Sequence, residues 1–126
     1  MVGMPIPESA LIVDDEAHVR VFMKLMLGQL GIRVIYETGK PDEARALFAA
    51  HTPGLVTLDI NMPGGSGIEL LSEFRAADDE AVIVMVSGDV LTGTVKAAAD
   101  AGADGFIRKD LPREEILAEL GQILSN

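Results

Sequence analysis

Short apolar runs alternate along this chain with longer segments in which apolar residues recur at helical spacing. The apolar runs predict strands at residues 10–14, 33–37, 55–59, 81–87 and 105–109. The longer segments predict helices at approximately residues 16–30, 41–51, 66–77, 91–101 and 113–124. Run 81–87 is the most continuously apolar, so we expect it to be the central, buried strand.

Turn and capping residues support these boundaries. Gly31 follows the first predicted helix, where glycine commonly ends a helix. Pro41 stands at the first position of the second predicted helix, and two acids follow it in the first turn. Met23, Met26, Met62 and Met85 have the spacing of core residues rather than of a ligand set, and His18 and His51 are expected at the surface.

The strict strand–helix order predicts an α/β fold. Short loops between alternating strands and helices require right-handed crossovers and a parallel sheet covered on both faces. We therefore expect a three-layer, doubly wound (βα)5 sandwich with the flavodoxin-like strand order 2-1-3-4-5. Residues 9–126 would form this single domain, and residues 1–8 an N-terminal extension. Ligands of such sheets bind beyond the carboxyl ends of the strands, here between the first and third.

Composition narrows the possible partners. The 126 residues include 10 Lys and Arg against 20 Asp and Glu, which gives a net charge of −10 without any Lys/Arg cluster. This charge repels phosphate backbones and anionic lipids, so direct nucleic-acid or membrane binding is not expected. The absence of cysteine excludes a disulfide framework or a Cys-ligated zinc site, and with no apolar run of spanning length we expect a cytoplasmic protein.

Three carboxylates are predicted to meet at the strand switch point. Asp14 and Asp15 end the first predicted strand, and Asp59 ends the third. Like charges this close raise one another's pKa values unless a cation joins them, and hard oxygen ligands suit Mg²⁺. Ser87 and Lys109, at the ends of the fourth and fifth strands, belong to the same edge.

Carboxylates, one hydroxyl and one ammonium together predict phosphoryl transfer onto a carboxylate. Asp59 is the candidate nucleophile, while Lys109 and Ser87 would each contact a phosphoryl oxygen. Gly88 lacks a Cβ and would leave room above the site. Taken singly, each feature has an ordinary structural explanation, because Asp also favours helix N-caps and turns; their combination favours function.

Four motifs together resemble one known family. "VDDE", "DINMPGGSG", "VSG" and "FIRK", in this order, resemble the receiver domain of bacterial two-component response regulators, of the chemotaxis-regulator type. The resemblance runs from about residue 9 to residue 124. It implies that Asp59 is the phosphoacceptor and that Mg²⁺ is held by Asp15, Asp59 and the backbone carbonyl of Asn61, with Asp14 acting through water.

The same resemblance implies a switch and its partners. Ser87 would be the switch hydroxyl, and Phe106 the aromatic residue whose rotamer follows it, so that phosphorylation changes the face formed by helix four, strand five and helix five. The donor would be a histidine kinase or a histidine phosphotransfer protein, and the protein would catalyse only its own modification. Because nothing follows helix five in this sequence, we expect the output to be a bound partner protein. A piece of a longer regulator or of a hybrid kinase would have the same sequence, and homodimerisation is also left open.

One residue departs from the family pattern. Receiver domains usually carry a cis proline after the lysine, whereas Asp110 follows Lys109 here. Since a non-proline cis bond costs ~2.5–4 kcal/mol, we expect the Lys109–Asp110 bond to be trans. Asn61 and Asp89 flank the expected phosphoryl position and would orient water for a modestly labile aspartyl phosphate.

Two alternatives remain at this stage. An aspartate-nucleophile phosphohydrolase of the haloacid dehalogenase type would use a similar site, but it normally has a second acid where Asn61 stands. A degenerate receiver would bind partners without phosphorylation, although here the acids, the hydroxyl and the lysine are all present.

Overall fold

A five-stranded parallel sheet forms the centre of the protein, whose computed structural model describes residues 6–88 and 92–125. Its strands are β1 (Ser9–Val13), β2 (Val34–Thr38), β3 (Leu55–Leu58), β6 (Val82–Ser87) and β7 (Gly105–Arg108). They are ordered β2-β1-β3-β6-β7, and every neighbouring pair is parallel. This confirms the predicted order 2-1-3-4-5, because β6 and β7 are the fourth and fifth strands of this sheet along the chain.

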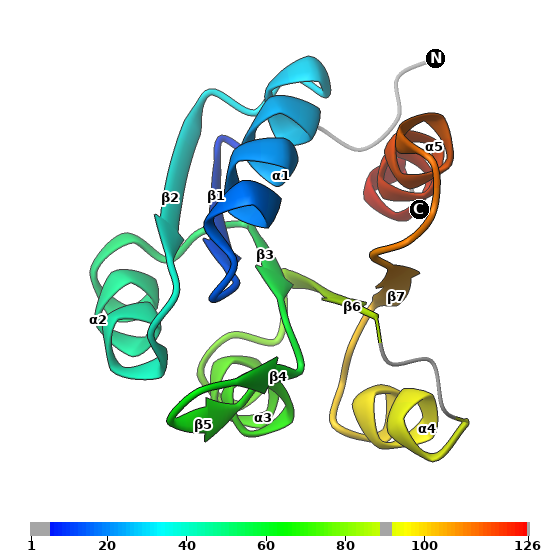
Figure 1. The fold of residues 1–126 in the computed structure, drawn as a ribbon. Helices are drawn as coiled ribbons and strands as arrows, with labels where there is room; N and C mark the ends of the chain where they lie inside the picture. Colours follow the sequence, from blue (N-terminus) through cyan, green and yellow to red (C-terminus); the bar gives the residue numbers. More distant parts are fainter. Residues whose placement is uncertain (1–5, 89–91, 126) are drawn as a thin grey trace.

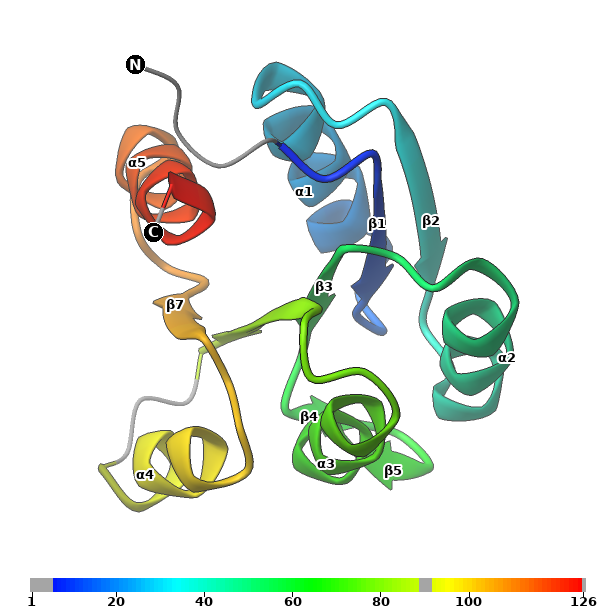
Figure 2. The ribbon, with the colours of Figure 1, turned by 180° about the vertical axis from the view of Figure 1, so that it is seen from behind.

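Helices cover both faces of the sheet (Figures 1 and 2). They are α1 (Ala17–Gln29), α2 (Pro41–His51), α3 (Gly67–Ala77), α4 (Thr92–Asp100) and α5 (Arg113–Ser125). Helices α1 and α5 lie on one side, and α2, α3 and α4 lie on the other. The protein is therefore the predicted three-layer sandwich. No helix within the described ranges is both long and apolar enough to cross a lipid bilayer.

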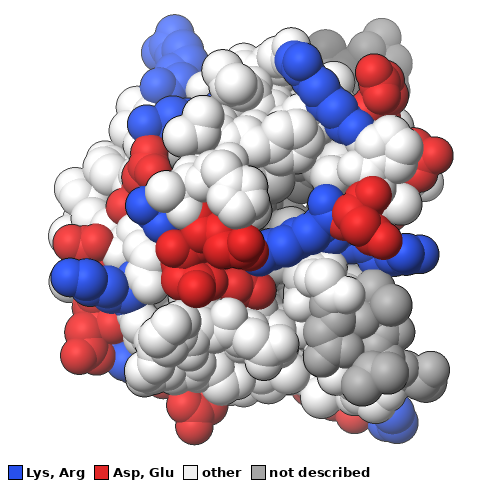
Figure 3. Space-filling view, viewed as in Figure 1, with Lys and Arg blue, Asp and Glu red and all other residues white. Residues whose placement is uncertain are grey.

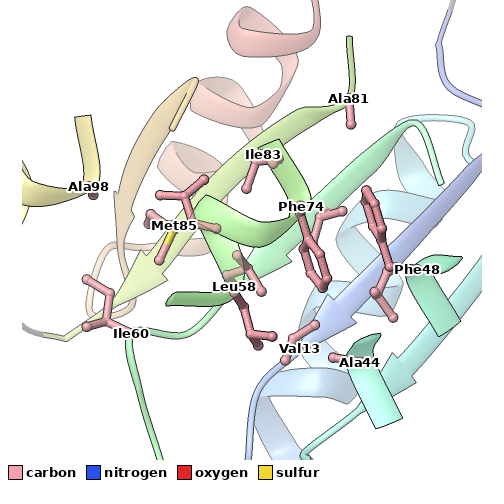
Figure 4. Close-up of a cluster of buried hydrophobic side chains, with 14 of the residues drawn as sticks. Val13, Ala44, Phe48, Leu58, Ile60, Phe74, Ala81, Ile83, Met85 and Ala98 are labelled. Atoms are coloured by element: carbon pink, nitrogen blue, oxygen red, sulfur yellow. The ribbon is translucent and has the colours of Figure 1, made fainter. Parts of the chain in front are cut away.

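Successive residues of a strand point to opposite faces of the sheet and pack into two separate hydrophobic cores. In β1, Leu11 and Val13 belong to the core under α2, α3 and α4, whereas Ala10 and Ile12 belong to the core under α1 and α5. Phe48 and Phe74 stack in the first core, with ring centroids 4.1 Å apart (Figure 4). Burial on both faces explains why the interior strands β1, β3 and β6 are mostly apolar instead of alternating with polar residues.

The centre of the sheet differs from the prediction. β3 occupies the middle position, and β6 lies between β3 and β7. The prediction that run 81–87 is the central strand was therefore wrong, although the strand is interior and its residues Ile83–Ser87 are buried. A continuous apolar run shows that both faces are covered, and every interior strand of this sheet meets that condition.

A short antiparallel hairpin was not predicted. β4 (Asn61–Met62) pairs with β5 (Gly65–Ser66), and Gly64 between them has φ +85°. Strands of two residues are too short to produce a recognisable alternation of polar and apolar positions. The hairpin leads directly into α3, whose first turn is capped by the Ser66 hydroxyl accepting a hydrogen bond from the Ile68 N–H at 3.2 Å.

Most other element ends lie within one or two residues of their predicted positions. The differences that matter concern the acids: β1 ends at Val13 and β3 at Leu58, so Asp14 and Asp59 follow their strands rather than ending them. Gly31 has φ +99° and terminates α1 as predicted. His18 and His51 are exposed, and the four methionines assigned to the core are buried.

Candidate functional site

The three predicted carboxylates meet at the carboxyl edge of the sheet. Asp14, Asp15 and Asp59 each offer an oxygen, and these oxygens lie within 4.8 Å of one another. Asp14 and Asp59 are buried, at 2% and 5% exposure, whereas Asp15 is exposed. On the face of the protein drawn in Figure 3, Asp and Glu side chains gather near the middle, beside Lys and Arg side chains. The cluster is thus buried on one side and open to solvent on the other.

Backbone contacts fix the position of Asp59. Its N–H donates to the carbonyl of Val13 at 2.9 Å, which continues the β1–β3 ladder one step past β3. The backbone of Gly67 packs against Asp59 so closely that a Cβ at Gly67 would overlap the Asp59 carbonyl group. Gly67 also donates its N–H to Ile60 at 2.8 Å. The glycine at the start of α3 is therefore required for the path of the chain through Asp59.

Lys109 joins the acids with a single ammonium group. Its Nζ lies 2.8 Å from Asp14 Oδ2, 2.9 Å from Glu16 Oε1 and 3.4 Å from Asp59 Oδ2. The Lys109 N–H donates to the Ser87 carbonyl at 2.9 Å, which aligns the end of β7 with the end of β6. The lysine therefore neutralises part of the charge of the acid cluster through Asp14 and Asp59.

The pKa values follow this arrangement. Burial, helped by the negative charge of Asp14, raises the pKa of Asp59 to about 6, and Lys109 only partly opposes this rise. Burial alone would lower the pKa of Lys109, but its hydrogen bonds to Asp14 and Glu16 outweigh burial and hold that pKa above its usual value. The buried Asp59 carboxylate is thus under-compensated, which makes it a good partner for an additional cation.

The donor set suits a hard divalent cation. All three candidate ligands are carboxylates, without a histidine among them and with no cysteine in the chain. Such oxygen ligands favour Mg²⁺, which keeps several waters and needs only one or two protein carboxylates. Asn61, whose carbonyl is the fourth predicted ligand, begins β4 two residues after Asp59 and is exposed.

The other predicted site residues surround the same edge. Ser87 is buried, at 1% exposure, at the end of β6. Gly88 follows it, is exposed, and has open space where a Cβ would be. Phe106 in β7 is half-buried beside Met85, packs against the core under α4, and lines an open hollow of about 200 Å³. Asp89 lies outside the described residues.

Asp110 does not disturb Lys109. The Lys109–Asp110 bond is trans, since the described residues contain no cis peptide bond, and this confirms the prediction. The Asp110 carboxylate accepts hydrogen bonds from Arg108 at 3.0 and 2.7 Å. Its charge is therefore compensated on the outer side of β7, while the Lys109 ammonium turns toward the acid cluster.

Two residues near the site were not predicted. Glu16 shares the Lys109 ammonium, and Arg20 donates to the main-chain carbonyl of Asp14 at 2.8 Å. Glu16 could have been noted as a third acid following Asp14 and Asp15, at the start of a helix. Arg20 carried no signal except its place one turn into that helix.

Comparisons with known proteins agree with this geometry. The sequence model of the response regulator receiver domain matches residues 10–121. The chain is 36% identical to the chemotaxis protein CheY of Bacillus subtilis over 115 residues, which cover 91% of this chain and 96% of that protein. It is 32% identical to the nitrate/nitrite response regulator NarL of Escherichia coli, but spans only 54% of that protein's length.

Solved structures show the same fold. A chain in the crystal structure of the CheX–CheY–BeF3–Mg²⁺ complex from Borrelia burgdorferi superimposes with a TM-score of 0.87 at 30% identity, covering 96% of this chain and 92% of that chain. The matched family model covers most of the sequence, and the acid cluster and the lysine occupy the sheet edge where ligands of this fold bind. The chain therefore belongs to the receiver domain family of two-component response regulators.

Proposed function

We propose that this receiver accepts a phosphoryl group on Asp59 from a phosphohistidine donor, in a reaction that depends on Mg²⁺. The observation that carries the proposal is that the buried Asp59 carboxylate lies beside both the acid pair and the Lys109 ammonium, 3.4 Å from its Nζ. A lone buried carboxylate would not need both neighbours. A carboxylate that receives a phosphoryl group needs positive charge on two sides of the incoming oxygens.

The transfer itself requires little covalent chemistry from the protein. An oxygen of ionised Asp59 forms the new bond to phosphorus, the P–N bond of the phosphohistidine breaks, and its electron pair returns to the imidazole nitrogen of the donor. Lys109 donates to one phosphoryl oxygen and Ser87 to another. Asp15, Asp59 and the Asn61 carbonyl would hold Mg²⁺, with Asp14 acting through water, and the ion would supply the charge neutralisation that phosphoryl transfer requires.

The signal would leave the site through the end of β6. Ser87 is buried at the strand end, and Phe106 lies in the neighbouring strand against a hollow lined by Val95 and Ala98 of α4. Recruitment of the Ser87 hydroxyl by the phosphoryl group would allow Phe106 to turn inward and would bias the α4–β7–α5 face toward a partner protein.

The donor would approach beside α1. An open hollow of about 600 Å³ lies between α1 and the start of α5, next to Lys109 and Gly88, and its walls include the apolar side chains of Val19, Phe22 and Ile116. Val21 and Leu25 of α1 are exposed at 58% and 60%. An apolar surface beside the phosphoacceptor fits the helical domain of a histidine kinase or a histidine phosphotransfer protein.

The family assignment removes one of the two alternatives. The chain is a receiver, so the phosphohydrolase of the haloacid dehalogenase type is not retained. A phosphorylation-independent receiver remains the second candidate, but no structural observation favours it. The modification would be the protein's own, with no metabolite turned over.

Intact mass spectrometry after incubation with acetyl phosphate and Mg²⁺ tests the proposal. We expect a single phosphoryl adduct in the wild type and none in Asp59→Asn or when Mg²⁺ is chelated. Asp100→Asn, which alters an exposed acid of α4, is the matched control and should be labelled normally. Absence of an adduct under conditions that label another receiver would favour the phosphorylation-independent module.

A further inference from the structure

The turn that carries the acid pair leaves one main-chain group outside the sheet. The Asp14 N–H donates to the Thr38 carbonyl at 3.0 Å, as a continuation of the β1–β2 ladder. The Asp14 carbonyl instead accepts a hydrogen bond from Arg20 Nη1 at 2.8 Å. A carbonyl in a partly buried turn needs such a donor, and a guanidinium supplies a charge-assisted one.

Arg20 is itself held in place. Its Nε donates to Glu37 Oε1 at 3.1 Å, and the other oxygen of Glu37 lies 2.7 Å from Lys24 Nζ. Gly39 borders the guanidinium closely, because a Cβ there would lie 3.1 Å from Arg20 Nη1 and 3.2 Å from the Asp15 Cα. The fork of Arg20 thus joins the end of β2 to the turn between β1 and α1.

We propose that Arg20 is a positioning residue for the divalent cation: by fixing the Asp14 carbonyl to Glu37, it sets the Asp14 and Asp15 carboxylates for metal binding. This inference rests on the proposed function, since it requires that the acid cluster binds Mg²⁺. Arg20 acts through the main chain of Asp14 and is not a ligand. Removal of a residue that orients a metal ligand without binding the metal itself commonly weakens metal binding.

The sign of the effect separates positioning from simple electrostatics. Arg20 brings a positive charge close to the acid cluster, and this charge repels a cation. If charge alone mattered, Arg20→Gln would tighten Mg²⁺ binding and Arg20→Lys would leave it unchanged. Positioning predicts the opposite: both substitutions weaken binding, because neither side chain can hold the Asp14 carbonyl and Glu37 together.

Isothermal titration of MgCl2 into the full chain at constant ionic strength measures this directly. We expect the Mg²⁺ dissociation constant to rise about 10-fold in both Arg20→Gln and Arg20→Lys. Lys24→Ala, which removes the other cation on Glu37 without touching Asp14, should stay within about 2-fold of the wild type. At saturating Mg²⁺, labelling by acetyl phosphate should recover in both Arg20 variants.

Unchanged or tighter binding in Arg20→Lys would overturn the inference, and so would equal weakening in Lys24→Ala. Circular dichroism establishes that each variant is folded; if Arg20→Gln does not fold, Arg20→Lys decides. A wild-type protein that does not bind Mg²⁺ would instead contradict the proposed function, so the two failures are distinguishable.

Discussion

The ammonium of Lys109 lies closer to Asp14, at 2.8 Å, than to the phosphoacceptor candidate Asp59, at 3.4 Å. Without a metal, the lysine therefore serves mainly as the counter-ion of Asp14, one member of the acid pair Asp14 and Asp15. A cation bound by that pair would take over this role and would leave Lys109 available for a phosphoryl oxygen. The energetic coupling between metal and lysine leads to the first prediction.

Lys109→Met should destabilise the metal-free protein and make its stability more dependent on Mg²⁺. The substitution leaves buried carboxylates without their counter-ion, so we expect the free energy of unfolding to fall by about 2–3 kcal/mol at pH 8. Saturating Mg²⁺ should restore much of this loss. Urea unfolding followed by far-UV circular dichroism measures both, since the chain contains no tryptophan.

Lys96→Met is the matched control. Lys96 pairs with Asp100 on the surface of α4, with both side chains at least two-thirds exposed, so its removal should cost about 0.5 kcal/mol or less. Equal losses in the two lysine variants, or no response of Lys109→Met to Mg²⁺, would contradict the predicted coupling.

Asp59→Asn should stabilise the metal-free protein above pH 6. The folded pKa of Asp59, about 6, is above its ordinary value of 3.8, so ionised Asp59 disfavours the folded state. This destabilisation is complete above pH 6 and disappears as the pH falls toward 4. The pKa difference corresponds to about 2–3 kcal/mol, which is the expected advantage of Asp59→Asn at pH 8 in EDTA.

The same variant should lose most of this advantage at pH 4 and in saturating Mg²⁺. At each pH, the free energy of unfolding of the wild type is subtracted from that of Asp59→Asn, so that contributions of acids common to both proteins largely cancel. Asp100→Asn, which alters an exposed carboxylate, is the control and should change the free energy of unfolding at pH 8 by about 0.5 kcal/mol or less. A constant difference between Asp59→Asn and the wild type from pH 4 to pH 8 would mean that the pKa of Asp59 is not raised.

Gly67→Ala should damage both the fold and the site. A Cβ at this position would overlap the carbonyl group of Asp59, so either α3 or Asp59 must shift. We expect a loss of about 1–3 kcal/mol in the free energy of unfolding and a lower rate of labelling by acetyl phosphate. Gly28→Ala is the control. Gly28 lies in α1, and a Cβ there would meet no atom within 4 Å beyond the nearby backbone of the helix itself. Because alanine favours a helix more than glycine does, this substitution should stabilise the protein by about 0.5–1 kcal/mol.

Strand ends explain why much of the site could be predicted from the sequence. The carboxyl ends of parallel strands share one edge, so the order of the strands alone brings Asp14 and Asp59 together and places Lys109 at the same edge, two strands from β3. By contrast, the contact between Lys109 and Glu16 joins residues 93 positions apart and depends on the rotamers of two long side chains. Arg20 was also missed, because its role depends on the direction of the Asp14 carbonyl group, which the sequence does not reveal.

The position of β3 in the middle of the sheet could not be derived from hydrophobicity. Each interior strand is covered on both faces, so burial does not distinguish β3 from β6. The β4–β5 hairpin could not be predicted either, since strands of two residues are too short to show an alternation of polar and apolar positions. Predictions therefore succeeded where one strong pattern decides a feature, and failed where the choice depends on tertiary contacts.

Asp110→Asn should leave phosphorylation almost unchanged, although the residue adjoins Lys109. The Asp110 carboxylate is bound by Arg108 on the outer surface of β7 and is 63% exposed, so it does not compete for the Lys109 ammonium. We expect the rate of labelling by acetyl phosphate to stay within about 2-fold of the wild type, as for other exposed ion pairs. Lys109→Met, measured in parallel, should lose most of its labelling. If Asp110→Asn lost as much labelling as Lys109→Met, the charge of Asp110 would contribute to the site despite its ion pair with Arg108.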